Sequence, residues 1–135
     1  MILPECSADP CLLDVDFIHD FLRASYWAKD CSRQTVETCI RNSVNIGMYL
    51  SGTQIGYARV VTDQAVFAYL MDVFIAESYR GRGYGEQLVA FVLNYEPLRH
   101  VKTWRLATTD AHELYRKFGF QALAYPEKMM EWKRS

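Results

Sequence analysis

The sequence has almost no net charge and no apolar run long enough to cross a membrane. Its 15 Lys and Arg residues are balanced by 16 Asp and Glu residues, and the basic ones are scattered, which argues against nucleic acid as a partner. The longest uninterrupted apolar run covers residues 65–71, far short of the roughly 20 residues that a membrane-spanning helix needs. Residues 1–6 lack the basic segment of a secretory signal. We therefore expect a cytoplasmic protein with no nucleic-acid or membrane partner.

Cysteine and histidine occur without the spacing of a metal site. The cysteines form no C-x-x-C pair, and the three histidines stand at no ligand spacing from them. We therefore expect no bound metal and interpret the cysteines as free thiols in a reducing compartment. All four lie in the first third of the chain: Cys6, Cys11, Cys31 and Cys39.

Length and composition favour one packed domain over residues 1–135. Half of the residues are hydrophobic, and a chain of this length buries roughly two-thirds of the surface that its unfolded form exposes. A short first strand is compatible with residues 1–13. Periodicity and turn signals then predict two helices, three antiparallel strands, a helix, a strand, a short helix and two last strands. The expected ranges are helices 14–25 and 32–43, strands 44–50, 54–62 and 65–75, helix 83–94, strand 104–108, a helix from 110, and strands 120–125 and 129–133.

Turn and cap residues indicate where several of these elements begin and end. Ser32 is placed to cap the second helix, and residues 51–52, Ser-Gly, suit the turn of a hairpin. Glu113 is placed to complete a capping box at the start of the short helix. Gly119 suits the left-handed residue that ends the same helix.

A glycine-rich loop lies between the apolar strand 65–75 and the helix that follows it. Glycines at alternate positions leave the backbone without Cβ atoms, so that successive N–H groups can close around an anion. The positive end of the following helix points to the same place, and two arginines add forked donors suited to phosphate. A plain turn is the alternative, but the arginines favour a phosphate site. The loop reads Arg80-Gly81-Arg82-Gly83-Tyr84-Gly85-Glu86.

Two familiar phosphate motifs are absent, and a third fits. A G-x-G-x-x-G pattern begun at Gly81 meets Glu86 where its last glycine should stand, and the chain has no Gly-Lys-Ser/Thr. The pattern [R/Q]-x-x-G-x-[G/A] fits residues 80–85, and A-x-x-L-Y-x-x-x-G-F fits residues 111–120. In this order and separation the two motifs resemble those of the GNAT N-acetyltransferase superfamily. The motif-level resemblance covers residues 65–120.

The resemblance implies an α/β (α+β) fold and an acetyl-CoA site. The expected architecture is a mixed, mainly antiparallel central sheet with helices on both faces and a splayed strand pair that holds acyl-CoA. Acetyl-CoA is the implied acyl donor, with no metal. The residues implied to bind it are the backbone of Val73, Phe74 and Ile75 for the pantetheine arm, Thr108 where the family often has asparagine, and the loop Arg80, Gly81, Arg82, Gly83, Tyr84, Gly85 and Glu86 for the pyrophosphate.

Tyr115 is the candidate general acid. An amine that attacks a thioester expels a thiolate, and a tyrosine with an ordinary pKa of about 10 is protonated at neutral pH and can donate to that sulfur. Helical spacing turns Tyr115 away from the face shared by Leu114 and Phe118, so that its side chain can line the gap between the splayed strands. The alternative is a core aromatic residue.

Asp72 is the candidate base, with a water relay as the fallback. A lysine-like amine costs roughly 4–5 kcal/mol to present neutral at neutral pH, so a group must accept its proton. Some GNAT members carry an acid just before the aspartate on this strand, but here that position is Met71. Asp72 is the only charge in strand 65–75 and needs a partner or an opening. The alternative is a structural role, such as pairing with Arg59.

The acceptor site is the least constrained by the sequence. By resemblance it is built from the first two helices, their connection and the last strands, where Tyr26, Trp27 and Trp104 can line a pocket or belong to the core. The favoured function is transfer of an acetyl group to a small-molecule amine or an exposed amino group by direct attack in a ternary complex. The alternatives are a coenzyme A-binding regulatory module without turnover and a nucleotide-binding protein of another fold. The sequence leaves open whether the chain forms a homodimer.

Overall fold

The fold is built on a sheet whose strands lie side by side in chain order. The computed structural model describes residues 2–135. Within this range the sheet has five strands. The first four pair antiparallel in chain order, and the fifth runs parallel to the fourth. This mixed, mainly antiparallel sheet confirms the predicted fold class. The strands are β1 (Glu5–Ser7), β2 (Val44–Leu50), β3 (Thr53–Thr62), β4 (Phe67–Ile75) and β5 (Thr103–Arg105).

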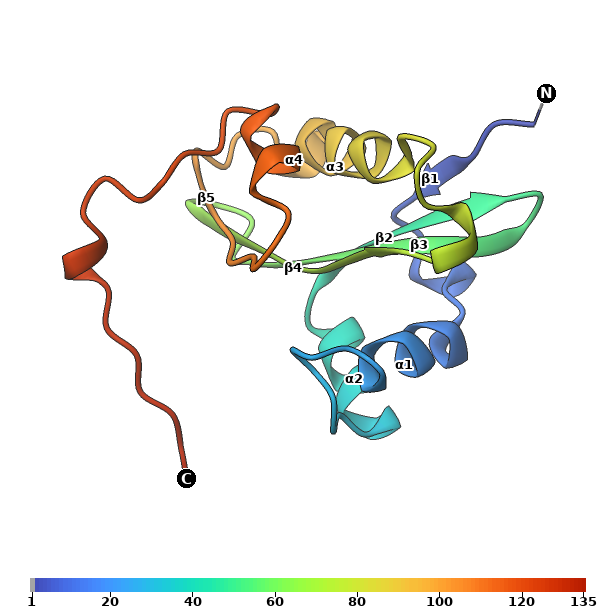
Figure 1. Cartoon of the computed structure of the whole chain (residues 1–135), viewed down its shortest axis with the longest axis horizontal. Coiled ribbons are helices and arrows are strands. Elements are labelled where there is room, and N and C mark those ends of the chain that lie inside the picture. The colour runs from blue at the N-terminus through green and yellow to red at the C-terminus, as the bar shows by residue number, and fades with distance from the viewer. Residues whose placement is uncertain (1) are drawn as a thin grey trace.

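Helices cover both faces of the sheet (Figure 1). The first two, α1 (Val15–Arg23) and α2 (Arg33–Arg41), lie on one face, and α3 (Tyr84–Asn94) and α4 (His112–Arg116) lie on the other. Four single turns of 3₁₀ helix complete the described part of the chain: η1 (Pro10–Leu12), η2 (Glu77–Tyr79), η3 (Glu96–Leu98) and η4 (Pro126–Lys128). None of the helices between residues 2 and 135 is long and apolar enough to cross a membrane.

Short-range hydrogen bonds set the ends of the first elements. The Asp14 side chain accepts a hydrogen bond from the backbone N–H of Phe17 at 3.0 Å and begins α1. Ser32 begins α2 in the same way, which confirms its predicted cap. Ser51 and Gly52 have φ angles of 50° and 82°. Two left-handed residues of this kind make the tight turn that suits the twist of a hairpin, as predicted for β2 and β3.

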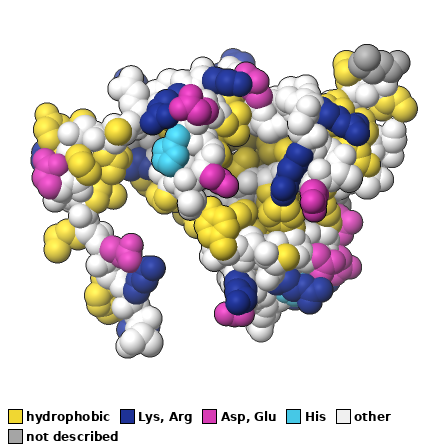
Figure 2. Space-filling model, in the orientation of Figure 1, with side chains coloured by type: hydrophobic (Ala, Val, Ile, Leu, Met, Phe, Trp, Pro, Cys, Tyr) yellow, Lys and Arg dark blue, Asp and Glu magenta, His cyan; other side chains and the backbone are white. Residues whose placement is uncertain are grey.

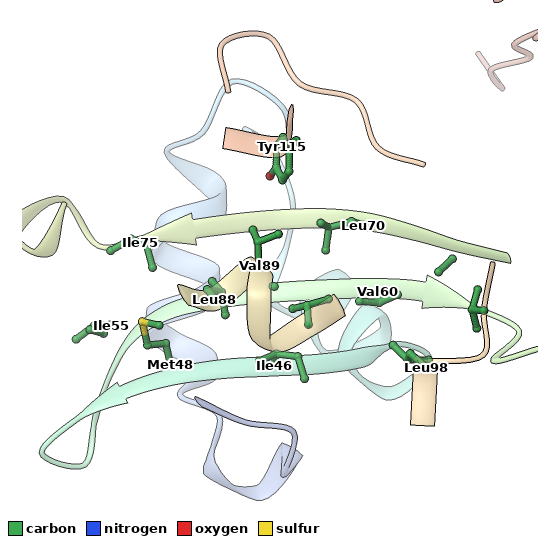
Figure 3. Close-up of a cluster of buried hydrophobic side chains, with 14 residues drawn as sticks. Ile46, Met48, Ile55, Val60, Leu70, Ile75, Leu88, Val89, Leu98 and Tyr115 are labelled. Atoms are coloured by element: carbon green, nitrogen blue, oxygen red, sulfur yellow. The ribbon is translucent and has the colours of Figure 1, made fainter. Parts of the chain in front are cut away.

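Two hydrophobic clusters hold the layers together. The larger one joins the sheet to α3 and includes Ile46, Val60, Leu88 and Val89, none of which is exposed to solvent (Figure 3). The smaller one joins α1 and α2 to the opposite face of the sheet. Each buried side chain of this size contributes on the order of 1.5–3 kcal/mol. The members of the smaller cluster are Ile18, Leu22, Val36, Tyr57 and Phe74.

A bulge and an early separation shape the end of β4. The β3–β4 register passes from Tyr57 opposite Phe74 to Arg59 opposite Met71, so two residues of β4 stand opposite one of β3. One of the two is Asp72, whose φ of 52° lies in the left-handed region, and bulges of this kind re-aim side chains. On its other edge β4 pairs with β5 as far as Tyr69. The splayed strand pair predicted by the resemblance is therefore present.

The two predicted C-terminal strands are wrong. Residues 120–125 and 129–133 form no strand in the described chain, and the predicted strand 104–108 ends at Arg105. Residues 121–135 are all exposed and extend away from the sheet as an arm (Figure 1). A strand needs a neighbour to receive its backbone hydrogen bonds, and the arm has none within residues 2–135.

The predicted capping box of the short helix is also wrong. The N-cap of α4 is Ala111, which has no side-chain hydrogen bond to the helix. Glu113 instead pairs with Arg116 one turn later. Gly119, with a φ of 95°, does take the left-handed conformation predicted for it.

Candidate active site

A cavity of about 440 Å³ opens where β4 and β5 separate. One wall is β4 at residues 70–73, and the facing wall is the segment 106–111 that follows β5. Two parts of the chain far apart in the sequence, residues 26–27 and α4, complete it. The cavity therefore brings together six of the residues predicted for the site: Tyr26, Trp27, Asp72, Val73, Thr108 and Tyr115.

The glycine-rich loop has the conformation and the open space that an anion site needs. Gly81 and Gly83 have φ angles of 79° and 81°, and a Cβ atom added to either would meet no atom within 4 Å. Gly83 is the N-cap of α3 and has no side chain with which to bond the first turn. The N–H groups of that turn have no partner inside the helix. They are therefore available to a phosphate, which the helix end also attracts.

The two arginines of the loop are held by neighbouring groups. Arg80 donates a hydrogen bond from Nε to the carbonyl oxygen of Ile75 at 3.0 Å, and its guanidinium lies 5.8 Å from the Phe21 ring centre. Arg82 lies 5.6 Å from the ring centre of Tyr79. Both side chains thus keep their charge beside the loop. Glu86, the acidic residue of the loop, lies 3.6 Å from the ammonium group of Lys117.

The loop, the end of β4 and α4 meet at one place. A Cβ atom on Gly85 would lie 3.9 Å from Ile75 and 4.0 Å from Leu114. The side chains of Phe74 and Ile75 are buried, and Phe74 stacks on Phe21 with ring centres 3.8 Å apart. Those side chains belong to the core, so only their backbone can serve a ligand. The Ile75 carbonyl already accepts the hydrogen bond from Arg80.

Tyr115 lies beyond the edge of β4 (Figure 3) and is only 8% exposed. Burial raises the pKa of its hydroxyl to about 12, and the nearby charge of Asp110 acts in the same direction. Its ring packs edge-on against Phe120 at 5.8 Å. Tyr115 is therefore part of the core and also lines the cavity, and its hydroxyl holds its proton at neutral pH.

Asp72 is held by two donors from distant parts of the chain. The Nε of Arg59 donates to one carboxylate oxygen at 2.8 Å, and the indole N–H of Trp27 donates to the other at 2.9 Å. The side chains of Arg59 and Asp72 are only 11% and 8% exposed. The pairing with Arg59 that the sequence left open is thus present. Asp72 nevertheless lines the cavity, so its remaining lone pairs can meet a ligand.

A second cavity of about 230 Å³ adjoins the first and lies between α1, α2 and the sheet. The two cavities share Trp27, Met71 and Asp72. The lining of the second is mostly apolar and includes Cys31 and Cys39. Sequence reasoning missed this cavity. The signal that could have found it is the helical spacing of Val36 and Cys39, which puts both apolar side chains on one face of α2. Burial raises the pKa of the Cys31 thiol, with the charge of Asp72 acting in the same direction.

The other predicted residues differ in their placement. Tyr26 and Trp27 are 67% and 44% exposed and contact each other edge-on at 5.2 Å. Thr108 accepts a hydrogen bond from the Ala111 N–H at 3.0 Å, so its hydroxyl proton can still be donated. Trp104 lies outside the cavity and packs against the larger cluster, with its indole N–H bonded to the Val101 carbonyl. Within residues 2–135, no group of three His, Cys, Asp or Glu residues could hold a metal ion.

Comparisons with known proteins agree with this architecture. The family model described as "Acetyltransferase (GNAT) domain" matches residues 41–122. A Gibberella zeae protein named as an acetyltransferase is 32% identical in an alignment that covers 82% of this chain and 75% of that protein. A Xanthomonas campestris structure assigned to the GNAT acetyltransferases is 38% identical, with a TM-score of 0.94 over 99% of this chain and 95% of that one. Its overlap therefore includes the C-terminal arm.

A more distant structure shares the fold alone. It comes from Clostridium acetobutylicum, was solved with acetyl-CoA, and is 13% identical with a TM-score of 0.69, covering 98% of this chain and 96% of its own.

Proposed function

Because the chain belongs to the GNAT acetyltransferase family, we propose that it transfers an acetyl group from acetyl-CoA to a primary amine. The observation that carries the proposal is the cavity between β4 and segment 106–111, where Tyr115 and Asp72 line the same space. A protonated hydroxyl and a carboxylate in one cavity match what attack of an amine on a thioester requires.

The residues of this chain fit acetyl-CoA, which supplies the thioester that the amine attacks. The first turn of α3 and the glycines of its loop, with their open space, suit the pyrophosphate. The edge of β4 beyond Tyr69 has lost its β5 partner, so its backbone groups can bond the amides of the pantetheine arm. The Thr108 hydroxyl stands across the same cavity.

Tyr115 acts as a hydrogen-bond donor to the sulfur rather than as a full proton donor. Its pKa is about 12, whereas a cysteine-like thiol has a pKa of about 8.5. Complete transfer of the proton from Tyr115 to the thiolate is therefore uphill by about 5 kcal/mol. A hydrogen bond to the charge that develops on sulfur needs no such transfer.

Asp72 binds the acceptor amine and passes its proton on through water. Two of its lone-pair positions are taken by Arg59 and Trp27, and the others remain for an ammonium group. The adjoining cavity of about 230 Å³ is small and mostly apolar. These features favour a small primary amine or an exposed amino group over a folded basic protein segment, which would require several carboxylates.

Direct attack in a ternary complex is favoured over a covalent acyl-enzyme. Cys31 and Cys39 are the cysteines that line the adjoining cavity. A nucleophilic cysteine acts as a thiolate, and the raised pKa of Cys31 keeps its thiol protonated.

The test is the release of free thiol from acetyl-CoA in the presence of a panel of primary amines. We expect amine-dependent release, with a kcat/KM that rises with pH as the amine loses its proton. Calorimetric binding of acetyl-CoA without release for any amine would instead identify a coenzyme A-binding module without turnover. Absence of binding would overturn both.

A further inference from the structure

The smaller cavity, between α1, α2 and the sheet, combines apolar walls with the carboxylate of Asp72. Its volume is about 230 Å³. A dry apolar cavity of about 150 Å³ in another protein takes a benzene molecule, so this space admits a substituent of roughly eight carbon atoms. The apolar walls come from α1, α2, the segment that joins them and two strands, and they consist of Ile18, Leu22, Ala28, Val36, Tyr57 and Met71.

Two large polar side chains of this lining already have partners. Tyr57 donates its hydroxyl proton to the side-chain oxygen of Asn45. Arg59 donates from Nη1 to the Ser43 hydroxyl at 3.1 Å, in addition to its bond with Asp72. Asp72 is the one acidic residue among the described residues that line the cavity. A ligand of this cavity therefore meets its carboxylate at Asp72 and mainly apolar surface elsewhere.

Asp72 lies where the smaller cavity joins the larger one. Trp27, Met71 and Asp72 line both cavities, whereas Tyr115 lines the larger cavity and not the smaller. An ammonium group held by the remaining lone pairs of Asp72 would thus stand at the junction. The acyl donor would lie on one side of it and the apolar cavity on the other. Because an acyl chain has no charge to meet this carboxylate, the smaller cavity suits the acceptor better than a long acyl group.

Arg59 makes the smaller cavity unfavourable for a second cation. Its side chain lines the cavity and is only 11% exposed. If one ammonium of a diamine met Asp72, the other would enter apolar space beside this guanidinium, and a buried cation without a partner is costly. Figure 2 shows basic and acidic side chains interspersed over the described residues on the face in view, rather than gathered by sign. That face therefore offers no acidic surface that would attract a polycation.

We propose that the acceptor is a primary monoamine whose compact apolar substituent, an alkyl chain or an aryl group on a short linker, fills the smaller cavity. This inference rests on the proposed function and names the class of its acceptor. The amine nitrogen bonds to the carbonyl carbon of the thioester as the C–S bond breaks, and the electron pair of that bond leaves with sulfur. The ammonium gives up two protons in all, of which one ends on sulfur and one in solvent. The product is an acetamide that carries the apolar substituent on its nitrogen.

The test follows thiol release from acetyl-CoA with linear alkylamines that differ only in chain length. The kcat/KM should rise from ethylamine to hexylamine by at least about tenfold, because each methylene that becomes fully buried is worth up to about fourfold. The gain should end near octylamine, where the cavity is full. Putrescine has nearly the same length as pentylamine and should be poorer by at least about tenfold, because a second ammonium replaces the methyl end.

The outcomes separate this inference from the proposed function. Equal kcat/KM values along the alkylamine series, or putrescine as good as pentylamine, would overturn the inference and leave acetyl transfer standing. A flat alkylamine series together with a preference for longer acyl-CoA donors would place the acyl group in the smaller cavity and would also overturn it. Absence of thiol release with every amine would refute the proposed function and the inference together.

Two alanines of neighbouring positions offer matched variants. Ala28 lines the smaller cavity, whereas Ala24 is exposed and lines neither cavity. Ala28→Phe should fill the space and abolish the preference for hexylamine over ethylamine, and Ala24→Phe should preserve it. Thr35→Phe adds a ring to a lining residue on α2 and should give the same loss as Ala28→Phe. The ratio of two amines on one protein does not depend on the folded fraction, so a parent ratio in both lining variants would contradict the inference.

Discussion

Replacement of Tyr115 by phenylalanine removes one hydroxyl and keeps the ring that packs on Phe120. The raised pKa of about 12 sets the size of the expected effect. Because the proton is not fully transferred, the variant loses a hydrogen bond to a developing charge, worth about 1.5–3 kcal/mol. We therefore expect kcat to fall by about 10²-fold, with the affinity for acetyl-CoA little changed.

Tyr49 offers a matched control for this substitution. Burial also raises its pKa to about 12, and its hydroxyl is buried without a hydrogen-bond partner in the described part of the chain. Tyr49→Phe therefore makes the same chemical change away from the cavity. It should keep the parent kcat and leave the free energy of unfolding unchanged or slightly higher, since an unsatisfied polar group is removed.

The assay is thiol release at saturating acetyl-CoA across pH, with affinity measured by calorimetry. A raised pKa keeps Tyr115 protonated to higher pH, so the parent should show no loss of kcat from this group up to about pH 10. A parent rate in Tyr115→Phe would reduce Tyr115 to a packing residue. A decline of kcat with an apparent pKa well below 10 that disappears in Tyr115→Phe would refute its assignment as a neutral donor.

Three further predictions concern the loop, the carboxylate and the core. Gly83→Val should weaken acetyl-CoA binding by at least about tenfold in calorimetry, because the valine side chain would fill the open space of the loop. Gly52→Val is the control: both variants should lower the free energy of unfolding by about 1–2 kcal/mol, but Gly52→Val should leave the affinity unchanged. Asp72→Asn should lower kcat/KM for amines by about tenfold or more. Trp27→Phe removes one of the two hydrogen bonds to the Asp72 carboxylate and should lower kcat/KM by a smaller factor. Leu88→Ala should lower the free energy of unfolding in urea by about 2–5 kcal/mol.

Each of these predictions has an outcome that contradicts it. Equal losses of acetyl-CoA affinity in Gly83→Val and Gly52→Val would show that the Gly83 substitution acts by disturbing the fold and not by blocking the loop, since both glycines have nearly the same left-handed φ. If Asp72→Asn acetylates every active amine at the parent rate between about pH 6 and 9, Asp72 is structural. If Leu88→Ala were as stable as the parent, the neighbouring side chains would have filled the space of the Leu88 side chain, which is unexposed in the parent.

The parts of the fold that depend on short-range chemistry could be predicted from the sequence. The cap at Ser32, the hairpin turn at Ser51 and Gly52, and the left-handed Gly119 each follow from a few neighbouring residues. The glycine loop belongs to the same class, because its conformation is set by the residues within it. Tyr115 was predicted from a local motif, and the structure places it in the cavity.

The parts that depend on long-range contacts could not be predicted. Trp27 meets Asp72 across 45 residues of sequence, and nothing local to Asp72 specifies this contact. The pairing of Asp72 with Arg59, across 13 residues, was only one of the alternatives that the sequence left open. Trp104 is a residue type that often lines pockets, but here it packs against the larger hydrophobic cluster, outside the cavity between β4 and segment 106–111. The last two strands were predicted from a pattern that describes which side chains alternate. That pattern does not say whether a neighbouring strand is present within the same chain.

The separation of β4 from β5 leaves the inner edge of β4 without a backbone partner beyond Tyr69. Unpaired backbone groups are costly once water is excluded. The pantetheine arm carries amides that can bond to this inner edge. Under the proposed function, bound acetyl-CoA therefore completes the edge that the separation of β4 from β5 opens. Tyr115 and Asp72 line the cavity at the same opening.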